Sequence, residues 1–446
     1  MKRFKIILFH PMTLHEKYYR YYYVPYSVLS IASMIDRERY EVILIDNNVN
    51  KMKDYSEIIK TKSDGLLCVG VSAMIGHQIR DGLAFSRAIR QATPEIPIVW
   101  GGPLPTMLPQ ETLENKFIDI IIQGQGEVTF SELVNALANG KPIDSVKGIS
   151  FKSDGQILHT PHRNFIDINN FPPYRSVFDL VNMENYIRYD EHINSRTVNY
   201  HSSQGCPYNC GFCCETALWN HKWSAFSSAR TLDDIGFLSS MFNINGIKFY
   251  DSEFFIDHKR VIEFAQGVID RKLKIRWAAS VHPRNLERFS ESQIDLLRQS
   301  GVSRLLLGAE SGIQDELELV GKGTNKDMIV RLAKLCSKYD IVACFTFVTG
   351  YPTSPLSYID STLEFAKELR KIDNRHECKV HFYAPYPGTP LYSYAIQHGF
   401  KPPKTIEEWS WYDYYGIVTP WVDKEYEQKT RDFNEDNYPY LLPLDI

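Results

Sequence analysis

Residues 202–214 read SSQGCPYNCGFCC and contain three cysteines, Cys206, Cys210 and Cys213, in the spacing CxxxCxxC. Thiols this close together in a sequence are typical metal ligands. A closed zinc site or a fully thiolate-ligated iron–sulfur cluster needs four ligands, and no histidine follows at the spacing of a zinc finger. The pattern therefore predicts a cluster with one iron left open to another molecule. The adjacent Cys214 is expected to pack, because neighbouring side chains rarely point the same way.

This spacing, with an aromatic residue at Phe212 just before the third cysteine, resembles the radical S-adenosylmethionine (SAM) superfamily. The resemblance implies a 4Fe-4S cluster held by the three cysteines, with the amino and carboxylate groups of SAM on the open iron. Reduction of the sulfonium then yields a 5'-deoxyadenosyl radical. The alternative is a zinc site or a chance cluster of thiols.

The composition indicates an enzyme of a reducing compartment, and the expected location is cytoplasmic. The chain has 446 residues, enough for two or three domains, and a formal net charge of -4 with acidic and basic residues interspersed. Neither a nucleic-acid-binding stripe nor a polybasic membrane patch is expected. The eight cysteines do not form a secreted disulfide framework. Residues 1–9 are expected to lead into a first strand rather than to form a signal peptide, and no stretch is apolar enough for a transmembrane segment.

Short apolar runs alternate with amphipathic stretches over residues 1–140. This is the pattern of a parallel sheet with helices on both faces, so we expect a flavodoxin-like doubly wound α/β fold, a Rossmann-type domain. The ligand site of such a fold lies beyond the carboxyl ends of the strands. Strands are expected at 5–9, 40–45, 66–72, 96–100 and 118–122, and the clearest helices at 77–91 and 127–138.

Glycine-containing turns follow three of these strands, where glycine lets the backbone turn tightly and approach a ligand. The turns resemble those of the cobalamin-binding domain that precedes the barrel in one large group of radical SAM enzymes. The resemblance implies that they surround cobalamin. The residues that it assigns to cobalamin are Ser72, Ala73, Met74, Gly101, Gly102, Pro103, Gly124, Gly126 and Glu127.

Many cobalamin enzymes carry the motif Asp-x-His-x-x-Gly, whose histidine replaces the lower ligand of cobalt. The sequence has no such motif, and His77 lacks the preceding aspartate. His77 is instead expected to be a polar residue at a helix start. We therefore predict that cobalamin is bound with no histidine on the metal.

A partial (β/α)6 radical SAM barrel, an incomplete TIM barrel, is expected over 197–400, after a connector at 141–196. In the connector, Lys152–Gln156 predicts a hairpin turn, and the FPPY run at 171–174 cannot continue a helix or a central strand. The cysteine loop follows the first barrel strand, at the end where such barrels hold their chemistry. Strands are expected at 198–201, 246–251, 275–280, 304–308, 342–349 and 379–383, and helix caps at Thr231, Ser290 and Thr324.

Later barrel strands end in motifs to which the resemblance assigns SAM contacts. One stretch departs from the family, because it reads Asp-Ser-Glu where Gly-Gly-Glu is common. Residues 384–392, APYPGTPLY, resemble a closing signature of cobalamin-type members. The residues assigned to SAM are Phe212, Asp251, Ser252, Glu253, Glu310, Ser311, Gly350, Tyr351 and Pro352.

The remaining C-terminal stretch, 401–446, predicts a short aromatic-rich extension. Its aromatic cluster at 409–421, like that at 18–23, is expected to serve packing, with stacking on a planar ligand as the alternative. The acidic run 432–437 is expected to be a loose end.

The resulting prediction is a cobalamin-dependent radical SAM enzyme, a C-methyltransferase that uses a 5'-deoxyadenosyl radical and methylcobalamin to methylate an unactivated carbon. The alternatives are a cobalamin-dependent radical cyclisation or rearrangement and a non-catalytic cobalamin- or SAM-binding protein. A radical SAM enzyme without cobalamin is also left open. The resemblance implies an external electron donor such as flavodoxin or ferredoxin. Small molecules, lipids, tetrapyrroles and peptides all stay open as substrates.

Overall fold

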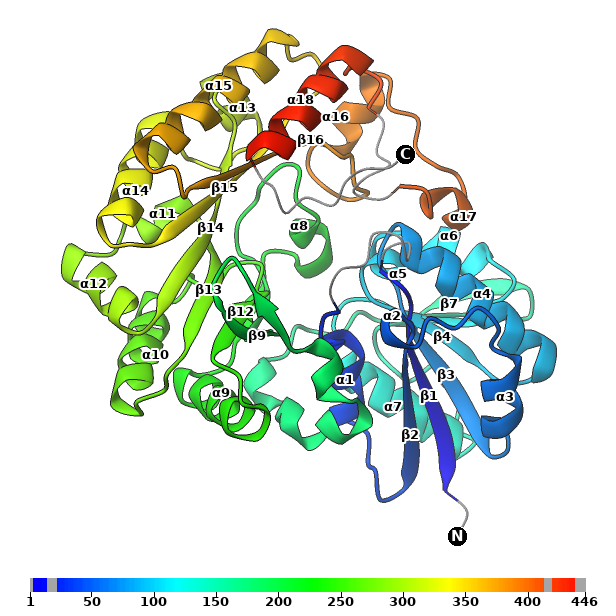
Figure 1. Ribbon diagram of the computed structural model, residues 1–446. Helices are drawn as coiled ribbons and strands as arrows, with labels where there is room; N and C mark the ends of the chain where they lie inside the picture. The colour runs from blue at the N-terminus through cyan, green and yellow to red at the C-terminus, as the bar shows by residue number, and fades with distance from the viewer. Residues whose placement is uncertain (1–2, 14–21, 413–418, 438–446) are drawn as a thin grey trace. The chain divides into compact units, whose positions relative to one another are not determined.

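A computed structural model describes residues 3–13, 22–412 and 419–437 (Figure 1). Its contacts divide the chain into two compact units. The first, here the flavodoxin-like unit, comprises Met1–Tyr186 and Pro402–Ile417, and the second, the barrel unit, comprises Ile187–Lys401 and Val418–Ile446. No helix among the described residues is long and apolar enough to cross a membrane.

The flavodoxin-like unit is built on a parallel sheet in which the strands are ordered β2-β1-β3-β4-β5. This order confirms the predicted doubly wound fold. Strand β3 has the predicted bounds, whereas β4 and β5 each begin two residues later than expected. The strands are β1 (Phe4–His10), β2 (Tyr40–Asp46), β3 (Leu66–Ser72), β4 (Ile98–Gly101) and β5 (Ile120–Ile122).

Helices cover both faces of this sheet. Gly70 and Val71 are neighbours on β3 and point to opposite faces. A side chain at Gly70 would meet Phe130 of α7, and Val71 lies against Gly82 of α4. The helices of this unit include α1 (Tyr26–Ser33), α3 (Ser56–Lys62), α4 (His77–Ala92), α5 (Pro103–Met107), α6 (Pro109–Glu114) and α7 (Glu127–Ala138).

An antiparallel hairpin extends the sheet beyond residue 140. Strands β6 (Ile149–Ser153) and β7 (Gln156–His159) join the edge at β5, and Asp154 and Gly155 form the turn with positive φ, which confirms the predicted hairpin. Short 3-10 turns follow as far as Tyr186. The first part of the connector is therefore part of the flavodoxin-like unit.

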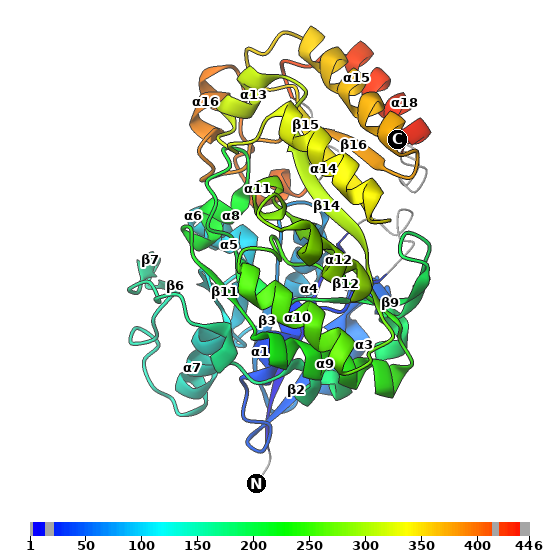
Figure 2. The same cartoon turned by 90° about the vertical axis from the view of Figure 1, so that its left-hand side faces the viewer.

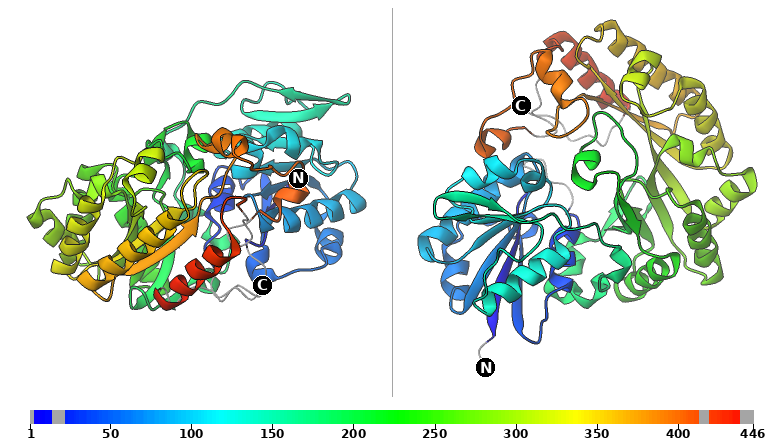
Figure 3. Two further views of the ribbon diagram at one scale, coloured as in Figure 1. Left: turned by 90° about the horizontal axis from the view of Figure 1, so that it is seen from above. Right: turned by 180° about the vertical axis from the view of Figure 1, so that it is seen from behind.

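The barrel unit contains six parallel strands in the order β16-β15-β14-β13-β12-β9, with the short β8 (Arg188–Asp190) antiparallel at the edge. The sheet curls without closing (Figure 3), which confirms the predicted partial barrel. The parallel strands are β9 (Ser195–Tyr200), β12 (Gly246–Phe249), β13 (Arg276–Val281), β14 (Val302–Glu310), β15 (Val342–Thr349) and β16 (Glu377–Phe382).

The helices that connect these strands cover the outer face of the sheet (Figures 1 and 2). Outward residues such as Ile247, Trp277, Leu305 and Phe345 are fully buried. We call the opposite face, which these connecting helices leave uncovered, the inner face. The outer helices are α9 (Ser228–Phe242), α10 (His258–Asp270), α12 (Glu291–Gln299), α14 (Lys326–Lys338) and α15 (Ser357–Ile372).

Of the three predicted helix caps, the one at Ser290 is confirmed, whereas the one predicted at Thr324 lies one residue later, at Asn325. Ser290 and Gln293 form a reciprocal capping box on α12, and the Asn325 side chain accepts a hydrogen bond from Met328 N on α14. The prediction at Thr231 is wrong. The cap of α9 lies four residues earlier, at Ser227, and Thr231 is buried in the first turn, where its hydroxyl donates to Ser227 O.

The prediction of a loose end at 432–437 is also wrong, because these residues belong to α18 (Lys424–Asn437). Phe433 is buried, and the Asn434 side chain accepts from Val380 N (2.9 Å) and donates to Val380 O (2.8 Å). The helix thus satisfies backbone groups on the exposed edge of β16, where an unpaired strand would otherwise invite aggregation.

Candidate functional site: a cysteine loop at the carboxyl edge of the barrel sheet

A buried polar network anchors the start of the cysteine loop. Asp251, just beyond β12, accepts hydrogen bonds from Ser202 N (2.6 Å), Ser203 N (3.1 Å) and Ser202 Oγ (2.5 Å). Arg260 of α10 donates to Ser202 Oγ (2.5 Å). Two short strands, β10 (Ser203–Gly205) and β11 (Trp223–Ala225), then pair across the loop. The network fixes the point at which the chain leaves β9.

The middle of the loop is held by backbone contacts. Gly211 N donates to Val320 O (2.8 Å), and Leu391 N donates to Gly211 O (3.0 Å). A Cβ at Gly211 would lie 2.8 Å from Leu391 Cγ, so only glycine fits this close approach. The chain then enters the short helix α8 (Cys214–Trp219), for which Cys213 is the N-cap residue. The cysteine loop therefore has a defined backbone.

The thiols of the loop are partly buried and electrostatically unfavourable as bare thiolates. Burial raises the pKa of Cys206 to about 12 and also raises the pKa of Cys210 and Cys213. A bound cation reverses this effect, because a coordinated thiol loses its proton. No three described Cys, His, Asp or Glu side chains surround a single metal position. A cluster places each thiol on a different iron, so three thiols on one loop suit a 4Fe-4S cluster.

Glu253 lies at the end of β12 beside the loop, and its buried carboxylate accepts from Phe255 N (2.8 Å) and His282 N. Burial raises the pKa of Glu253 to about 7. His282 stacks on Tyr208 of the cysteine loop (4.2 Å between ring centroids), and burial lowers the pKa of His282 to about 3. These contacts attach the loop to the carboxyl ends of β12 and β13. Of the neighbouring predicted residues, Asp251 anchors the loop, Ser252 is exposed and Phe212 is half-buried.

The carboxyl end of β14 carries a buried ion pair between Glu310 and Lys322. Glu310 has a positive φ of 64°, which turns the chain out of the strand. The next residue, Ser311, donates to Glu316 (2.5 Å) and accepts from Ile313 N (3.0 Å). Both of these predicted residues therefore have protein partners at this strand end.

The turn after β15 contains Gly350, Tyr351 and Pro352. Gly350 has a φ of 71°, and its carbonyl accepts from Trp421 Nε1 (2.5 Å). Tyr351 is buried and stacks on Tyr383, with ring centroids 5.0 Å apart. The carbonyl of Pro352 accepts from the Tyr394 hydroxyl.

Several buried polar atoms around this edge have no hydrogen-bond partner among the described residues. Buried polar groups in proteins are almost always satisfied, so such a group of atoms indicates a place for a polar ligand. The residues present therefore fit SAM, which offers amine, carboxylate and hydroxyl groups. The atoms are Ser203 Oγ, His282 Nε2, Asn285 Nδ2, Thr324 Oγ1, Thr349 Oγ1 and Tyr351 OH.

In the flavodoxin-like unit, the predicted turns lie together at the carboxyl edge of β3, β4 and β5. Ala73 N donates to Gly101 O (2.8 Å), and Leu104 N donates to Ala73 O (3.0 Å). Gly102 has a φ of 100°, and a Cβ there would lie 3.0 Å from Ala73 O.

The outer side of this edge is open. No atom lies within 4 Å of the Cβ position at Gly124, and Met74 is 50% exposed. Ser72 donates to Ser27 (3.1 Å), Pro103 begins α5, and Glu127 begins α7 with Gly126 as its N-cap residue. The open backbone turn at Gly124 and the exposed apolar side chain of Met74 leave room for a large cofactor such as cobalamin, whose corrin ring carries amide groups around its edge.

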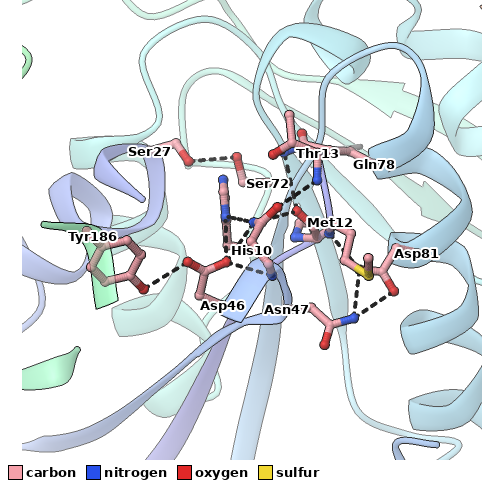
Figure 4. A network of polar contacts seen from close by, with 12 residues as sticks. His10, Met12, Thr13, Ser27, Asp46, Asn47, Ser72, Gln78, Asp81 and Tyr186 are labelled. Carbon is pink, nitrogen blue, oxygen red and sulfur yellow. Dashed lines mark hydrogen bonds and ion pairs between the residues drawn. The ribbon is translucent and has the colours of Figure 1, made fainter. Parts of the chain in front are cut away.

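A polar network at the ends of β1 and β2 was not foreseen (Figure 4). His10 Nδ1 contacts Asp46 Oδ1 (3.1 Å) and Asn48 Nδ2 (2.9 Å), and Tyr186 donates to Asp46 Oδ2 (2.8 Å). Burial alone would raise the pKa of Asp46, but the contacts with His10 and its other partners lower it. His77, which was expected at a helix start, is the first residue of α4.

The two aromatic clusters are only partly described, because 14–21 and 413–418 lie outside the described residues. In the N-terminal cluster, Lys51 lies over the ring of Tyr22. In the C-terminal cluster, Trp409 of α17 (Ile406–Trp409) is buried, and the exposed Trp411 stacks under the guanidinium of Arg80 (3.3 Å). Trp409 is thus packed as expected, whereas Trp411 lies at the surface on the guanidinium of Arg80.

A three-thiol loop on the first strand of a partial barrel, in a chain that also has a flavodoxin-like unit, defines a radical SAM enzyme with a cobalamin-binding domain. Comparison with known families agrees: residues 18–134 match the B12 binding domain and residues 200–366 match the radical SAM superfamily. The chain therefore belongs to the cobalamin-dependent radical SAM enzymes.

Relatives in sequence have more than one activity in their names. An uncharacterized methyltransferase from Pyrococcus horikoshii is 29% identical, over 83% of this chain and 78% of its own. Cytidylyl-2-hydroxyethylphosphonate methyltransferase from Streptomyces wedmorensis is 23% identical over 92% and 85%. The anaerobic magnesium-protoporphyrin IX monomethyl ester cyclase from Synechocystis is 26% identical over 73% of this chain, which spans only 64% of that protein.

Solved structures show the same fold. The radical SAM methyltransferase TsrM from Kitasatospora setae, with tryptophan and a SAM analogue bound, has a TM-score of 0.74 at 16% identity, over 96% of this chain and 88% of its own. The cobalamin-dependent radical enzyme OxsB, with aqua-cobalamin and SAM bound, has a TM-score of 0.70 at 18% identity, over 98% and 61%.

Proposed function

We propose that this enzyme transfers a methyl group from SAM to an unactivated carbon of its substrate. The observation that carries the proposal is the pairing of a three-thiol loop with a B12 binding domain, together with methyltransferase relatives that align over most of both chains. When bound, the cluster supplies an electron to SAM and cobalamin supplies a carrier for the methyl group. The protein contributes binding, orientation and exclusion of water.

Within this proposal, Cys206, Cys210 and Cys213 hold the cluster, and the polar edge around it holds SAM. The anchored loop backbone supports the first role, because contacts that involve no thiol fix the stretch of chain that carries the three cysteines. The proposed SAM residues are Phe212, Asp251, Ser252, Glu253, Glu310, Ser311, Gly350, Tyr351 and Pro352. Asp251 acts through Ser202 and Ser203, as a positioning residue for the loop.

Cobalamin is proposed to lie against the three turns of the flavodoxin-like unit. The closely packed turns after β3 and β4 give a rigid rim, and Gly124 leaves space beside it. The proposed contacts are Ser72, Ala73, Met74, Gly101, Gly102, Pro103, Gly124, Gly126 and Glu127. The same proposal includes the domain limits. They are a cobalamin-binding domain at 1–140, a connector at 141–196, a radical SAM barrel at 197–400 and a C-terminal extension at 401–446.

We also propose a cytoplasmic location and an external one-electron donor such as flavodoxin or ferredoxin. The supporting observation for the location is that all eight cysteines are free, as expected in a reducing compartment. A donor is needed because no other redox group is expected within the chain.

The test is a single-turnover reaction of the reconstituted, reduced enzyme with methyl-deuterated SAM under anaerobic conditions. Loss of the methyl group leaves S-adenosylhomocysteine, whereas radical formation leaves 5'-deoxyadenosine. We expect S-adenosylhomocysteine in an amount that follows the cobalamin content, and none in preparations without cobalamin. Formation of 5'-deoxyadenosine alone would contradict methyl transfer.

Ring formation without methyl transfer is the second candidate, because the chain also matches cyclases at 26% identity. Product masses separate the two functions once a substrate is known. A methylated product gains one labelled methyl group, whereas a cyclised product differs only in its hydrogen count. If neither S-adenosylhomocysteine nor 5'-deoxyadenosine forms, the remaining alternative is a non-catalytic protein that binds cobalamin or SAM.

A further inference from the structure

Lys322 is a lysine that the fold buries beside the cysteine loop. It lies in the short connection between α13 (Gln314–Leu319) and α14, where a lysine would ordinarily extend into solvent. Only 9% of its side chain is exposed. Gly321 and Gly323, on either side of it, both have a φ of 67°, a backbone conformation that favours glycine. The two glycines let the connection turn sharply, with the lysine side chain directed inward.

The same connection contacts the cysteine loop on both sides of Cys210. Val320 O accepts from Gly211 N (2.8 Å). A Cβ at Gly321 would lie 3.7 Å from Asn209 O. Two consecutive residues thus contact the two neighbours of Cys210, and the buried lysine follows them directly in the chain. Backbone contacts, which involve no thiol, therefore hold the lysine close to Cys210.

Glu310 of β14 is the partner of Lys322. The ion pair between them is buried, with 5% of the Glu310 side chain exposed. A Cβ at Gly308 would collide with both Lys322 Nζ and Glu310 Oε1, so the pair lies directly against the strand. A buried ion pair contributes little net stability, because desolvation offsets the attraction. The main consequence of this pair is therefore the electrostatic potential that it creates around the cysteine loop.

The two charges of the pair act on Cys210 in opposite directions. Burial raises the pKa of Cys210 and Lys322 lowers it, whereas Glu310 and Glu253 each raise it by less than Lys322 lowers it. Burial alone would lower the pKa of Lys322, but Glu310 and, to a smaller extent, Cys210 raise it. Lys322 is therefore a cation at neutral pH. The pair as a whole favours negative charge at Cys210.

We propose that the Glu310–Lys322 pair sets the reduction potential of the cluster: the charge of Lys322 raises the potential, and Glu310 limits the rise. Reduction adds one electron from the external donor and one negative charge, which a nearby buried cation stabilises. The inference rests on the proposed function, in which Cys210 holds the cluster. Lys322 acts through its charge and does not ligate iron. It makes the cluster easier to reduce by a donor such as flavodoxin or ferredoxin.

The test is a potentiometric titration of the reconstituted enzyme, followed by electron paramagnetic resonance of the reduced cluster. SAM is left out, because Glu310 is also a proposed SAM contact. We expect Lys322→Met to decrease the equilibrium constant for reduction by about tenfold or more, a shift of about 59 mV to lower potential for one electron. Glu310→Gln should shift the potential upward, because it leaves the charge of Lys322 unbalanced. The double variant Lys322→Met/Glu310→Gln should lie between the two single variants.

The matched control is Lys334→Met, which removes an exposed lysine from α14 and should titrate like the native enzyme. Structural damage lowers cluster content, which iron and sulfide analysis measures separately, and it gives no reason for shifts of opposite sign. Glu310→Gln is close to isosteric, so it tests the pair even if Lys322→Met takes up no cluster.

Equal potentials in the native enzyme and in both single variants would overturn the inference. A shift in the same direction in both, or an equal shift in Lys334→Met, would also overturn it. The titration involves no methyl transfer. A native enzyme that takes up the cluster but shows no dependence on the pair contradicts this inference alone, whereas a native enzyme that binds no cluster contradicts the proposed function as well.

Discussion

At the scale of single residues, the cysteine loop separates thiols with different expected roles. Cys206 lies in the anchored loop, whereas Cys214 is the first residue of α8. We expect Cys206→Ala to lose most of the iron, sulfide and visible absorption after anaerobic reconstitution, because two thiols are left to hold the cluster. Cys214→Ala is the matched control and should retain them. Equal loss in both variants would show that Cys214 is a ligand.

The histidines of the flavodoxin-like unit allow a test of cobalt ligation. No Asp-x-His-x-x-Gly motif is present, so we expect the paramagnetic resonance spectrum of bound Co(II) cobalamin to lack nitrogen superhyperfine splitting. The network around His10 makes this test sharper, because Asp46 orients its ring at a strand end. If splitting is seen, its loss in His10→Ala or in His77→Ala identifies the ligand and contradicts the prediction.

Glu377 gives a prediction for acid stability. Burial alone would raise its pKa, but Arg304 and His192 outweigh burial and lower the pKa of Glu377 to about 2. The unfolded value is about 4.3. A lowered folded pKa stabilises the protein above the unfolded value, and this contribution is lost as pH falls through about 4 toward 2.

In Glu377→Gln, the free energy of unfolding should therefore fall less steeply with decreasing pH over this window. Denaturant titrations at several pH values measure the slope. Equal slopes for the native chain and the variant would contradict the prediction. The variant should also be less stable at neutral pH, because Arg304 loses its buried partner.

At the scale of elements, the capping box of α12 gives a stability prediction. Ser290→Ala removes the acceptor for Gln293 N and should cost about 1 kcal/mol. For a unit of this size the expected fall in Tm is about 2 °C, measured by scanning calorimetry. Ser240→Ala on the exposed side of α9 is the control and should leave Tm unchanged. A similar fall in both variants would show that the cap is not the cause.

Elements with a strong local pattern were predictable from sequence. The continuous apolar run of β3 and the amphipathic α7 have the expected bounds, and so does β15. The cap of α9 was misplaced because Ser227 and Thr231 are both good capping residues one turn apart. Local pattern does not decide between them, whereas the burial of Thr231 does.

The missed parts of the site depend on contacts between distant residues. Tyr186 reaches Asp46 across 140 positions, and Glu377 meets Arg304 across 73. Single charges in apolar strands carry no motif. The available signal is that these charged residues take the place of every second side chain on β12, β14 and β16, which assigns them to one face of the sheet.

At the scale of the whole molecule, each unit has its own sheet and core, so each cofactor should load without the other. Substituting all three cluster cysteines by alanine should abolish iron binding and leave cobalamin content within about twofold. Gly102→Ala should reduce cobalamin content while iron remains, because alanine at φ 100° strains the backbone beside Ala73. Absorption spectra and metal analysis measure both. Joint loss of both cofactors in either variant would contradict independent loading.

The anchoring of the cysteine loop also bears on survival in air. Asp251 and Arg260 fix one end of the loop, and Val320 and Leu391 fix its middle, through contacts that involve no thiol. Oxidative loss of the cluster would therefore leave the scaffold in place. Rebuilding the cluster then requires iron and sulfide but little reordering of the chain. An enzyme that has lost its cluster in air is therefore expected to regain activity without new protein synthesis.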